Sequence, residues 1–480
     1  MRAMADAVVE RCIEHIATVD LQPSCGDVDA GALCRALREP APDHGVGPAG
    51  LGPLLDRMFH DWIPRSFTTI GPGYFAYIPG GGIYPAALAD FITNTTNRFT
   101  GVWYAAPALV QLEANALDWL REWMDFPPSA RGLFTTGGSM ATFNAIVCAR
   151  ERHLGAEIRR GTLYTSDQAH HSVLKAAKLA GVMPDRVRAV ASDDRYRLRL
   201  DGLADAMSAD RRAGLTPFVV VSSAGTTNTG AVDPLDEIAD LCAREGVWHH
   251  VDGAYGAFFY LCDELRAVLK GLSRADSVTL DPHKGMFLPY GTGALLVRDA
   301  AALRAAHEAT AAYLPAMPDP DDFYDPSQHG PELSRGFPGL RVWLSVKLYG
   351  AAAFRAAIAE KRALALDAYE RMARLPGVIV DAPPELSLFA FHLTWPGATR
   401  DEEDAATRRL LDATTARGRV MITGCTAHGR PSTSSGRPER VEGRFLARVC
   451  VLSFRTHHAH IDALVEDVAS AIADIVPVRL

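Results

Sequence analysis

The decapeptide DSVTLDPHKG, residues 276–285, joins an apolar strand to a group of polar residues. Val278 to Leu280 have the character of a buried strand, and an aspartate, a proline, a histidine and a lysine follow directly. A lysine at the inner end of a buried strand costs several kcal/mol unless it is paired or neutral. The stretch therefore predicts that Lys284 is kept at this place for a chemical purpose.

Short apolar strands alternate with amphipathic helices on both sides of this decapeptide, from Leu133 onwards. The other predicted strands lie in RGLFTTGG (131–138), GTLYTSD (161–167), PFVVVSSAG (217–225), VWHHVDG (247–253) and GALLVRD (293–299). This alternation predicts an α/β fold with a mainly parallel sheet covered by helices on both faces. In sheets of this kind, ligands bind at the carboxyl ends of the strands.

The chain divides into three predicted parts. Residues 1–64 form an N-terminal helical segment, residues 65–340 a large domain, and residues 341–480 a small C-terminal α+β domain that opens with a long helical stretch. Strands of the small domain are predicted in GVIV (377–380), LSLFAFHLTW (386–395), GRVMITG (418–424) and RFLARVCVLSF (444–454). The polar, Gly/Pro-rich residues 428–443 predict a surface loop.

Composition narrows the class of protein. The 480 residues are 48% hydrophobic, and the net charge of -8 with scattered basic residues argues against binding to nucleic acid or to a membrane surface. Acidic residues interrupt the N-terminal twenty residues where a signal peptide would be apolar, so a cytoplasmic protein is predicted. The eight cysteines show no CxxC spacing, and adjacent histidines in WHHVD and RTHHAH point to opposite faces of a strand, so no metal site is expected.

Several chemically useful groups follow the predicted strands. Gly138 and Ser139 in TTGGSM stand between a strand and a helix, where free backbone N–H groups bind anions; a simple turn capped by Ser139 is the alternative. Asp252 ends the strand in HHVDGAY, where a turn acid is the more common role. With Lys284 and the histidine of SDQAH, His170, these groups match the needs of pyridoxal phosphate: an imine-forming lysine, a partner for the ring nitrogen and a phosphate site.

Eight motifs in order resemble the group II pyridoxal-phosphate-dependent amino acid decarboxylases, the family of aromatic-L-amino-acid decarboxylase. The motifs are YFAYIPGG, PALVQLEANALDWL, TTGGSMAT, SDQAHHSV, SSAGTTNTG, HHVDGAYG, ADSVTLDPHKG and VCVLSFRTHH, and the similarity runs from about residue 65 to the C-terminus. The resemblance implies a fold-type I large domain with a seven-stranded sheet, a homodimer, and decarboxylation of an L-amino acid to an amine and CO2.

The resemblance also implies roles for individual residues. Lys284 matches the lysine that forms the Schiff base, Asp252 the partner of the pyridine nitrogen, and His170 the histidine that stacks on the cofactor ring. The remaining cofactor-binding positions are Gly138, Ser139 and His283 on the phosphate side and Thr227 and Ala254 at the ring. Two positions depart from the pattern: His171 replaces a frequent serine, and Asp281 stands where the aromatic-amino-acid enzyme has asparagine. An acid beside a phosphate would be repelled, which predicts a changed role for Asp281.

Decarboxylation to an amine requires a proton donor, which in this family is a tyrosine on a mobile loop. The corresponding loop is residues 313–337, and Tyr324 is the predicted donor. Phe323 adjoins it, and related aldehyde synthases carry phenylalanine at the donor position. A shift of one residue in the alignment would predict oxidative decarboxylation to an aldehyde instead, and Tyr324 as an ordinary surface aromatic remains the structural alternative.

A substrate pocket is predicted from the same resemblance. Its residues are Tyr77, Ile78, Gly80, Phe99, Gly101 and Trp103. Glycine at 80 and 101 replaces larger residues of the aromatic enzymes, which predicts space for a bulky, largely apolar or aromatic L-amino acid. The alternatives are that these aromatics pack a dimer interface, that the enzyme retains the carboxylate in another pyridoxal-phosphate reaction, or that the protein binds the cofactor without catalysis.

Overall fold

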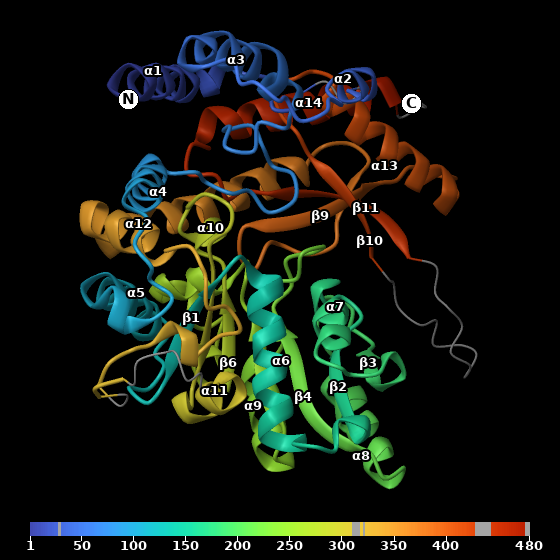
Figure 1. Cartoon of the computed structure of the whole chain (residues 1–480). Helices are drawn as coiled ribbons and strands as arrows, with labels where there is room; N and C mark the ends of the chain where they lie inside the picture. The colour runs from blue at the N-terminus through green and yellow to red at the C-terminus, as the bar shows by residue number, and fades with distance from the viewer. Residues whose placement is uncertain (27–29, 310–316, 320–321, 428–442, 476–480) are drawn as a thin grey trace.

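A seven-stranded sheet forms the centre of the large domain in the computed structural model, which describes residues 1–480 except 27–29, 310–316, 320–321, 428–442 and 476–480 (Figure 1). Its strands are β1 (Arg131–Thr135), β2 (Gly161–Ser166), β3 (Val187–Val190), β4 (Thr216–Ser223), β5 (Trp248–Asp252), β6 (Ser277–Leu280) and β7 (Gly293–Val297). The order is β1-β7-β6-β5-β4-β2-β3, and only β7 runs antiparallel to its neighbours. The predicted α/β class and mainly parallel sheet are confirmed.

Helices cover both faces of this sheet, as the alternating pattern predicted. One layer contains α6 (Gly138–Leu154), α7 (Ser172–Leu179) and α11 (Ala300–His307), with α6 in front of the sheet in Figure 1. The opposite face carries α5 (Pro107–Trp123), α8 (Leu200–Arg212) and α9 (Leu235–Glu245). Successive residues of β7 face opposite layers: Leu295 packs with the α6 layer and Leu296 with the α5 layer. A strand buried on both faces must be apolar throughout, and β7 is.

A four-stranded antiparallel sheet forms the small domain. Its order is β10-β11-β9-β8, with β8 (Val378–Val380), β9 (Leu388–Leu393), β10 (Thr423–Ala427) and β11 (Arg444–Cys450). Helices α13 (Arg400–Thr415) and α14 (His458–Ile475) pack against it. The strand predicted at 418–424 is displaced, because Met421 instead forms an isolated bridge to Tyr74 and β10 begins at Thr423. Most of the predicted surface loop, residues 428–442, lies outside the described residues.

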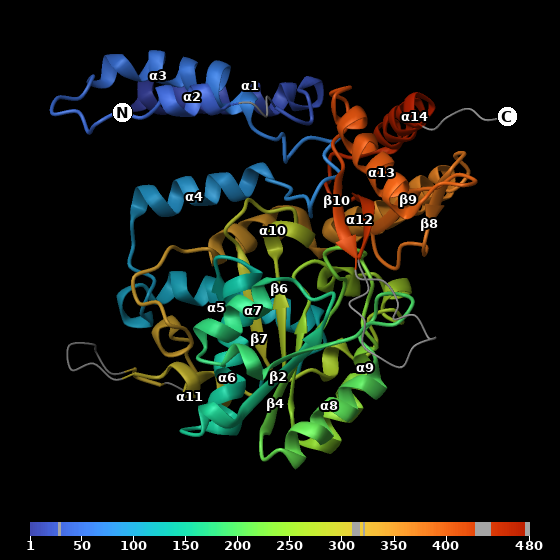
Figure 2. The same cartoon turned by 90° about the vertical axis from the view of Figure 1, so that its right-hand side faces the viewer.

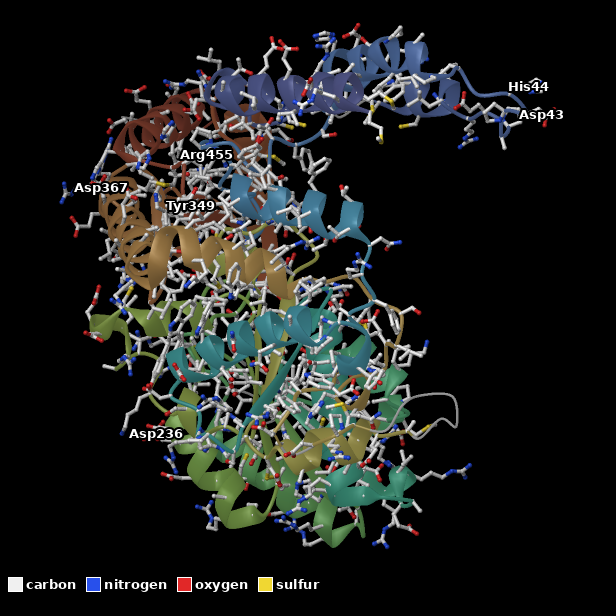
Figure 3. The ribbon with its side chains drawn as sticks, turned by 60° about the vertical axis from the view of Figure 1, so that its left-hand side comes forward. Asp43, His44, Asp236, Tyr349, Asp367 and Arg455 are labelled. Atoms are coloured by element: carbon white, nitrogen blue, oxygen red, sulfur yellow. The ribbon has the colours of Figure 1, made fainter. Side chains whose placement is uncertain are left out.

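The N-terminal residues form an arm of helices. It contains α1 (Arg2–Thr18), α2 (Gly31–Ala36) and α3 (Leu51–Arg57), which lie in a layer of their own above α4 (Tyr84–Thr96) in Figure 2. Asp43 and His44 mark the far end of the arm in Figure 3. Several apolar side chains of the arm are exposed, among them Val8, Val9 and Ile13. The predicted helical segment is present, while the domain boundaries at 64 and 340 remain predictions.

Helix α12 (Gly339–Met372) joins the two domains. It is the one helix within the described residues that is long and apolar enough to cross a membrane, with a mean hydropathy of 1.2 over its most apolar stretch. Gly350, with φ of 72°, interrupts it, so the part before Gly350 is too short to span a bilayer and the part after it carries charges such as Glu360 and Lys361. Because α12 also packs against α4, α5 and α14, it is a helix of the protein body.

Candidate active site

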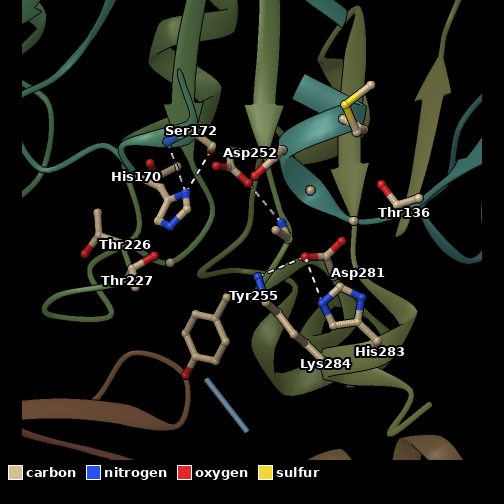
Figure 4. Close-up of a pocket in the computed structure, with 17 residues that line it drawn as sticks. Thr136, His170, Ser172, Thr226, Thr227, Asp252, Tyr255, Asp281, His283 and Lys284 are labelled. Carbon is tan, nitrogen blue, oxygen red and sulfur yellow. Dashed lines mark hydrogen bonds and ion pairs between the residues drawn. The ribbon is translucent and has the colours of Figure 1, made fainter. Parts of the chain in front are cut away.

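A cavity of about 360 Å³ opens at the carboxyl ends of the parallel strands (Figure 4). Residues just after β1, β2 and β6 and at the ends of β4 and β5 line it, which is where an α/β sheet places ligands. All eight predicted cofactor-binding residues lie around this one cavity: Gly138, Ser139, His170, Thr227, Asp252, Ala254, His283 and Lys284. The sheet therefore brings together side chains that are up to 146 positions apart, from 138 to 284.

The first turn of α6 presents backbone N–H groups to the cavity. Gly137 precedes the helix, and no side chain caps it, so Ser139 is not the cap that the alternative interpretation required. A side chain on Gly138 would lie 3.0 Å from Cβ of Ala254 and 3.1 Å from Oδ2 of Asp281. The glycine is therefore needed for close packing, and the helix start remains open to an anion.

Asp252 lies at the end of β5 and is half-buried. Its Oδ1 accepts a hydrogen bond of 3.2 Å from the backbone N–H of Ala254, and Oδ2 has no donor among the described residues. Burial raises the pKa of this carboxyl, and the positive charge of Lys284 opposes the rise. A protonated ring nitrogen placed at Oδ2 would stabilise the carboxylate and would itself be kept protonated.

Lys284 lies in the short helix α10 (Pro282–Gly285), directly after β6. Its Nζ is 2.9 Å from Oδ2 of Asp281, and the same oxygen is 3.5 Å from Nε2 of His283 (Figure 4). The His283 ring is fixed from its other side, where Nδ1 lies 2.8 Å from the carbonyl oxygen of Thr292. This arrangement offsets the free-energy cost of burying the Lys284 ammonium group, because the Asp281 carboxylate lies beside it as a counter-ion.

His170 follows β2 and presents its ring to the cavity. Its Nδ1 lies 2.8 Å from Oγ of Ser172, which fixes the ring orientation. Burial, together with the neighbouring His171 and Lys284, lowers the pKa of His170 to about 4. The ring is therefore neutral at neutral pH and offers a flat aromatic face. His171 is exposed, with its ring centroid 4.1 Å from that of His170, and it does not line the cavity.

The structure does not bring Tyr324 to this cavity. Its side chain is buried beside the His329 ring, at a centroid distance of 5.1 Å, and near the ion pair between Arg335 and Glu113. Burial raises the pKa of its hydroxyl well above the ordinary value. The preceding Phe323 stacks on Trp103 at 4.6 Å, while part of the predicted loop, 313–316 and 320–321, lies outside the described residues. The role of Tyr324 as proton donor stays a prediction.

The six predicted substrate-pocket residues are not among the residues that line the cavity. The space left by the two glycines is filled by neighbours: a side chain on Gly80 would lie 2.8 Å from the Tyr290 ring, and one on Gly101 would lie 1.9 Å from the carbonyl oxygen of Leu333. Glycine at these positions therefore accommodates other parts of this chain and leaves no added cavity. Ile78 is buried, whereas Tyr77 and Phe99 are exposed.

Other lining residues were not found from the sequence. They are Thr136, Met140, Ser172, Ser223, Gly225, Thr226 and Tyr255. Tyr255 could have been found, since it stands within the HHVDGAYG motif; its hydroxyl hydrogen-bonds Ser387 of the small domain. A second residue that the sequence could have pointed to is the arginine in the apolar strand β11. Arg448 is buried, and its guanidinium donates to the carbonyl oxygen of Tyr77 at 2.9 Å.

The arrangement fits pyridoxal phosphate. The uncapped start of α6 suits its phosphate, Oδ2 of Asp252 its ring nitrogen, and Lys284 its aldehyde, while the neutral His170 ring suits its flat face. When bound, this cofactor supplies a conjugated ring that stabilises the negative charge left on Cα when a carboxylate departs as CO2. Among the residues that the structure describes, no cluster of three or more His, Cys, Asp or Glu could hold a metal ion.

Fold and cavity together define a pyridoxal-phosphate-dependent enzyme of fold type I. Residues 55–394 match the pyridoxal-dependent decarboxylase conserved domain, so the chain belongs to this family of decarboxylases. The predicted family, cofactor and decarboxylase activity are thereby confirmed: the protein is a pyridoxal-phosphate-dependent amino acid decarboxylase.

Known relatives agree with this assignment. The chain is 35% identical over 424 residues to the aromatic-L-amino-acid decarboxylase of Bacillus atrophaeus, with 88% of each chain covered. It is 27% identical over 452 residues to the phenylacetaldehyde synthase of Arabidopsis thaliana, with 90% of each covered. The crystal structure of Oryza sativa TDC with PLP and tryptamine superposes with a TM-score of 0.90 at 26% identity, covering 99% of this chain and 98% of the other.

Substitution of Lys284 by alanine should remove the visible absorbance of covalently held cofactor and reduce amine production below detection. The reason is that Lys284 is the only lysine in the lining of the cavity within the described residues. Absorbance spectra and product assays of the Lys284→Ala variant test this. Lys178→Ala, which removes an exposed lysine of α7, is the matched control and should behave as wild type. Retained turnover in Lys284→Ala would contradict the assignment.

Proposed function

We propose that this enzyme decarboxylates an aromatic or similarly bulky L-amino acid to its amine, acting as a cytoplasmic homodimer. The observation that carries the proposal is the cavity in which Lys284, Asp252 and His170 meet at the strand ends. Relatives with printed activities towards tryptophan, tyrosine and aromatic L-amino acids support the substrate class. All eight cysteines are unpaired, which suits a reducing compartment.

The roles of the cavity residues follow from their positions. Lys284 would hold the cofactor's aldehyde carbon, Asp252 would keep its ring nitrogen protonated, and His170 would offer its ring to the cofactor's flat face. The remaining residues would orient the cofactor: Gly138, Ser139 and His283 at the phosphate, and Thr227 and Ala254 at the ring. A rigidly oriented ring is required, because the bond to the departing carboxylate must stand perpendicular to its plane.

Arg448 supports recognition of a substrate carboxylate. It lies on β11 and is fully enclosed, with Nη1 donating to Oγ1 of Thr423 at 3.3 Å and Nη2 to the carbonyl oxygen of Tyr77 at 2.9 Å. Its Nε is buried without a partner, and none of the described carboxylates forms an ion pair with it. Burial lowers its pKa, with Tyr255 of the cavity lining among its neighbours. An amino acid's carboxylate would neutralise this cation.

Exposed apolar side chains support a homodimer. On α4, Phe91 is 58% exposed and Ile92 47% exposed, and on α12, Leu348 and Tyr349 are also exposed. Helices α4 and α12 pack together, and Figure 3 labels Tyr349 on α12. Exposed apolar side chains on neighbouring helices are typical of an interface. A second copy is the proposed occupant, since it would also cover the exposed Tyr77 and Phe99 of the predicted substrate pocket.

Purified enzyme loaded with pyridoxal phosphate should convert L-tryptophan, L-tyrosine or L-phenylalanine to the matching amine with release of one CO2 per amine. Mass spectrometry of the products, with CO2 and peroxide assayed in parallel, tests the substrate class and the reaction together. D-amino acids and L-glutamate serve as competing substrates, and the Lys284→Ala protein as the inactive control. Preference for glutamate would contradict the proposed substrate class, and aldehyde with stoichiometric peroxide would place the enzyme with the aldehyde synthases.

Substitution of Tyr324 by phenylalanine should shift the products from amine towards aldehyde and peroxide, because the carbanion would lose its proton donor. The described position of Tyr324 is outside its own chain's cavity, so donation requires the segment to move or to serve a second copy. Product ratios at equal substrate conversion measure the effect. Phe323→Tyr is the matched control and should retain amine as its product. An unchanged ratio in Tyr324→Phe would assign the proton to another group.

Substitution of Phe91 by aspartate should convert the dimer to monomer and reduce activity at least tenfold, since a buried unpaired charge at an interface costs several kcal/mol. Sedimentation velocity and turnover measured on the same samples test this. Ile379→Asp is the matched control, because Ile379 is 44% exposed on β8, away from α4. A fully active monomer would contradict the proposed assembly.

A further inference from the structure

Asp281 lines the cavity and forms an ion pair with Lys284. It is 1% exposed and lies between the end of β6 and the start of α10. Its Oδ2 is 2.9 Å from Nζ of Lys284, and its backbone oxygen accepts a hydrogen bond of 2.8 Å from the N–H of the same lysine. Asp281 therefore holds Lys284 through both its side chain and its backbone.

Apart from Lys284, the Asp281 carboxylate has few partners. Oδ2 lies 3.5 Å from Nε2 of His283, and burial lowers the pKa of that histidine, so His283 is a weak competitor for the negative charge. Oδ1 is buried and has no hydrogen-bond partner among the described residues. Among the described residues, Lys284 is thus the principal counter-ion of Asp281.

The ion pair determines the charge of Lys284. Burial alone would lower the pKa of the lysine, but the charge and hydrogen bond of Asp281, helped by Asp252, raise it above the ordinary value. The other titratable groups that influence Lys284 or respond to it are His170, His283, Tyr290 and Cys450. Both histidines have lowered pKa values and are neutral at neutral pH, so the two aspartates supply the negative charge that this ammonium meets.

An ammonium ion cannot condense with an aldehyde. One proton must first leave Nζ, and Asp281 is the nearest acceptor. The nitrogen lone pair of the neutral amine then forms a bond to the aldehyde carbon, and the two remaining N–H protons leave with the carbonyl oxygen as water, which gives the C=N bond. A stronger ion pair therefore makes cofactor capture slower at a given pH.

The geometry points to Asp281 as a positioning residue that holds Lys284 as an ammonium ion and so sets the pH at which this chain captures its cofactor. The inference concerns the cofactor-free protein and is independent of which amino acid is decarboxylated. It is tested without substrate, so its failure would leave the proposed substrate class and product unaffected.

The experiment measures cofactor capture by the full chain after its cofactor has been removed. Rates of visible absorbance change on addition of pyridoxal phosphate are recorded against pH for wild type, Asp281→Asn and Asp281→Glu. Asp240→Asn, an exposed aspartate of α9, is the matched control. The series is repeated with pyridoxal, which lacks the phosphate. An effect that persists with pyridoxal comes from the charge of Lys284, whereas an effect that disappears comes from repulsion between Asp281 and the phosphate.

In Asp281→Asn, the midpoint pH of capture should fall by about one unit or more, because an adjacent opposite charge shifts a pKa by roughly that amount. At a fixed pH below both midpoints, this means capture about tenfold faster. Asp281→Glu should stay nearer to wild type, and Asp240→Asn should match it. A shift with pyridoxal phosphate but not with pyridoxal would overturn the inference in favour of an effect on the phosphate, as would equal midpoints for Asp281→Asn and wild type.

A measurement on the wild-type chain keeps the inference testable if the variants fold poorly. Reductive methylation of the cofactor-free protein at several pH values, followed by peptide mass spectrometry, reports the neutral fraction of each lysine. Lys284 should require a higher pH than the exposed Lys178 of α7. A Lys284 that reacts at lower pH than Lys178 would show that burial outweighs Asp281, and the inference would be wrong.

Discussion

The ion pair between Lys284 and Asp281, with Asp252 as a second carboxylate at the same cavity, is the interaction on which the site depends. A lysine buried at a strand end is tolerated only where negative charge accompanies it, and two aspartates supply that charge. The two carboxylates have different partners. Asp252 leaves Oδ2 free for a ring nitrogen, while Asp281 binds Nζ of Lys284. The two carboxylates therefore offset the free-energy cost of burying Lys284 and favour its charged form.

The sheet makes this arrangement possible. Strands β5 and β6 are adjacent and parallel, and Asp252 lies opposite Thr279. Both strands therefore end at the same edge of the sheet. The start of α6 reaches that edge too, where Asp281 crowds Gly138. Parallel strands end at the same edge only when the connection returns the chain to the opposite edge, and between β5 and β6 this connection contains three short 3-10 helices, Ala257–Leu261, Asp263–Leu265 and Leu272–Arg274. The fold and the site are therefore consequences of one connectivity.

The predictions that succeeded rest on local rules. Apolar strands buried on both faces, glycines at a strand-to-helix turn and polar residues at strand ends are visible in the sequence, and they predicted the sheet and the edge of it where Gly138, Asp252 and Lys284 lie. The other cofactor-binding residues were predicted from the resemblance to the decarboxylase family, and all eight predicted residues line one cavity. Strand β3 was missed because Val187–Val190 is short, partly exposed and at the edge of the sheet. The space beside Gly80 could not be foreseen either, since the Tyr290 ring that fills it comes from a segment more than two hundred residues away.

The position of Tyr324 relative to the cavity could not be predicted from the sequence. Its environment consists of His329, Arg335 and Glu113, which no local pattern connects, and it lies apart from the cavity that contains Lys284. Proton transfer requires hydrogen-bond distance, so either this segment moves or a second copy supplies the group. All eight predicted cofactor-binding residues line a cavity within one chain, whereas Tyr324 and the predicted substrate-pocket residues do not line it. The residues that would bind the substrate are therefore the part of the site that the fold of one chain leaves open to experiment.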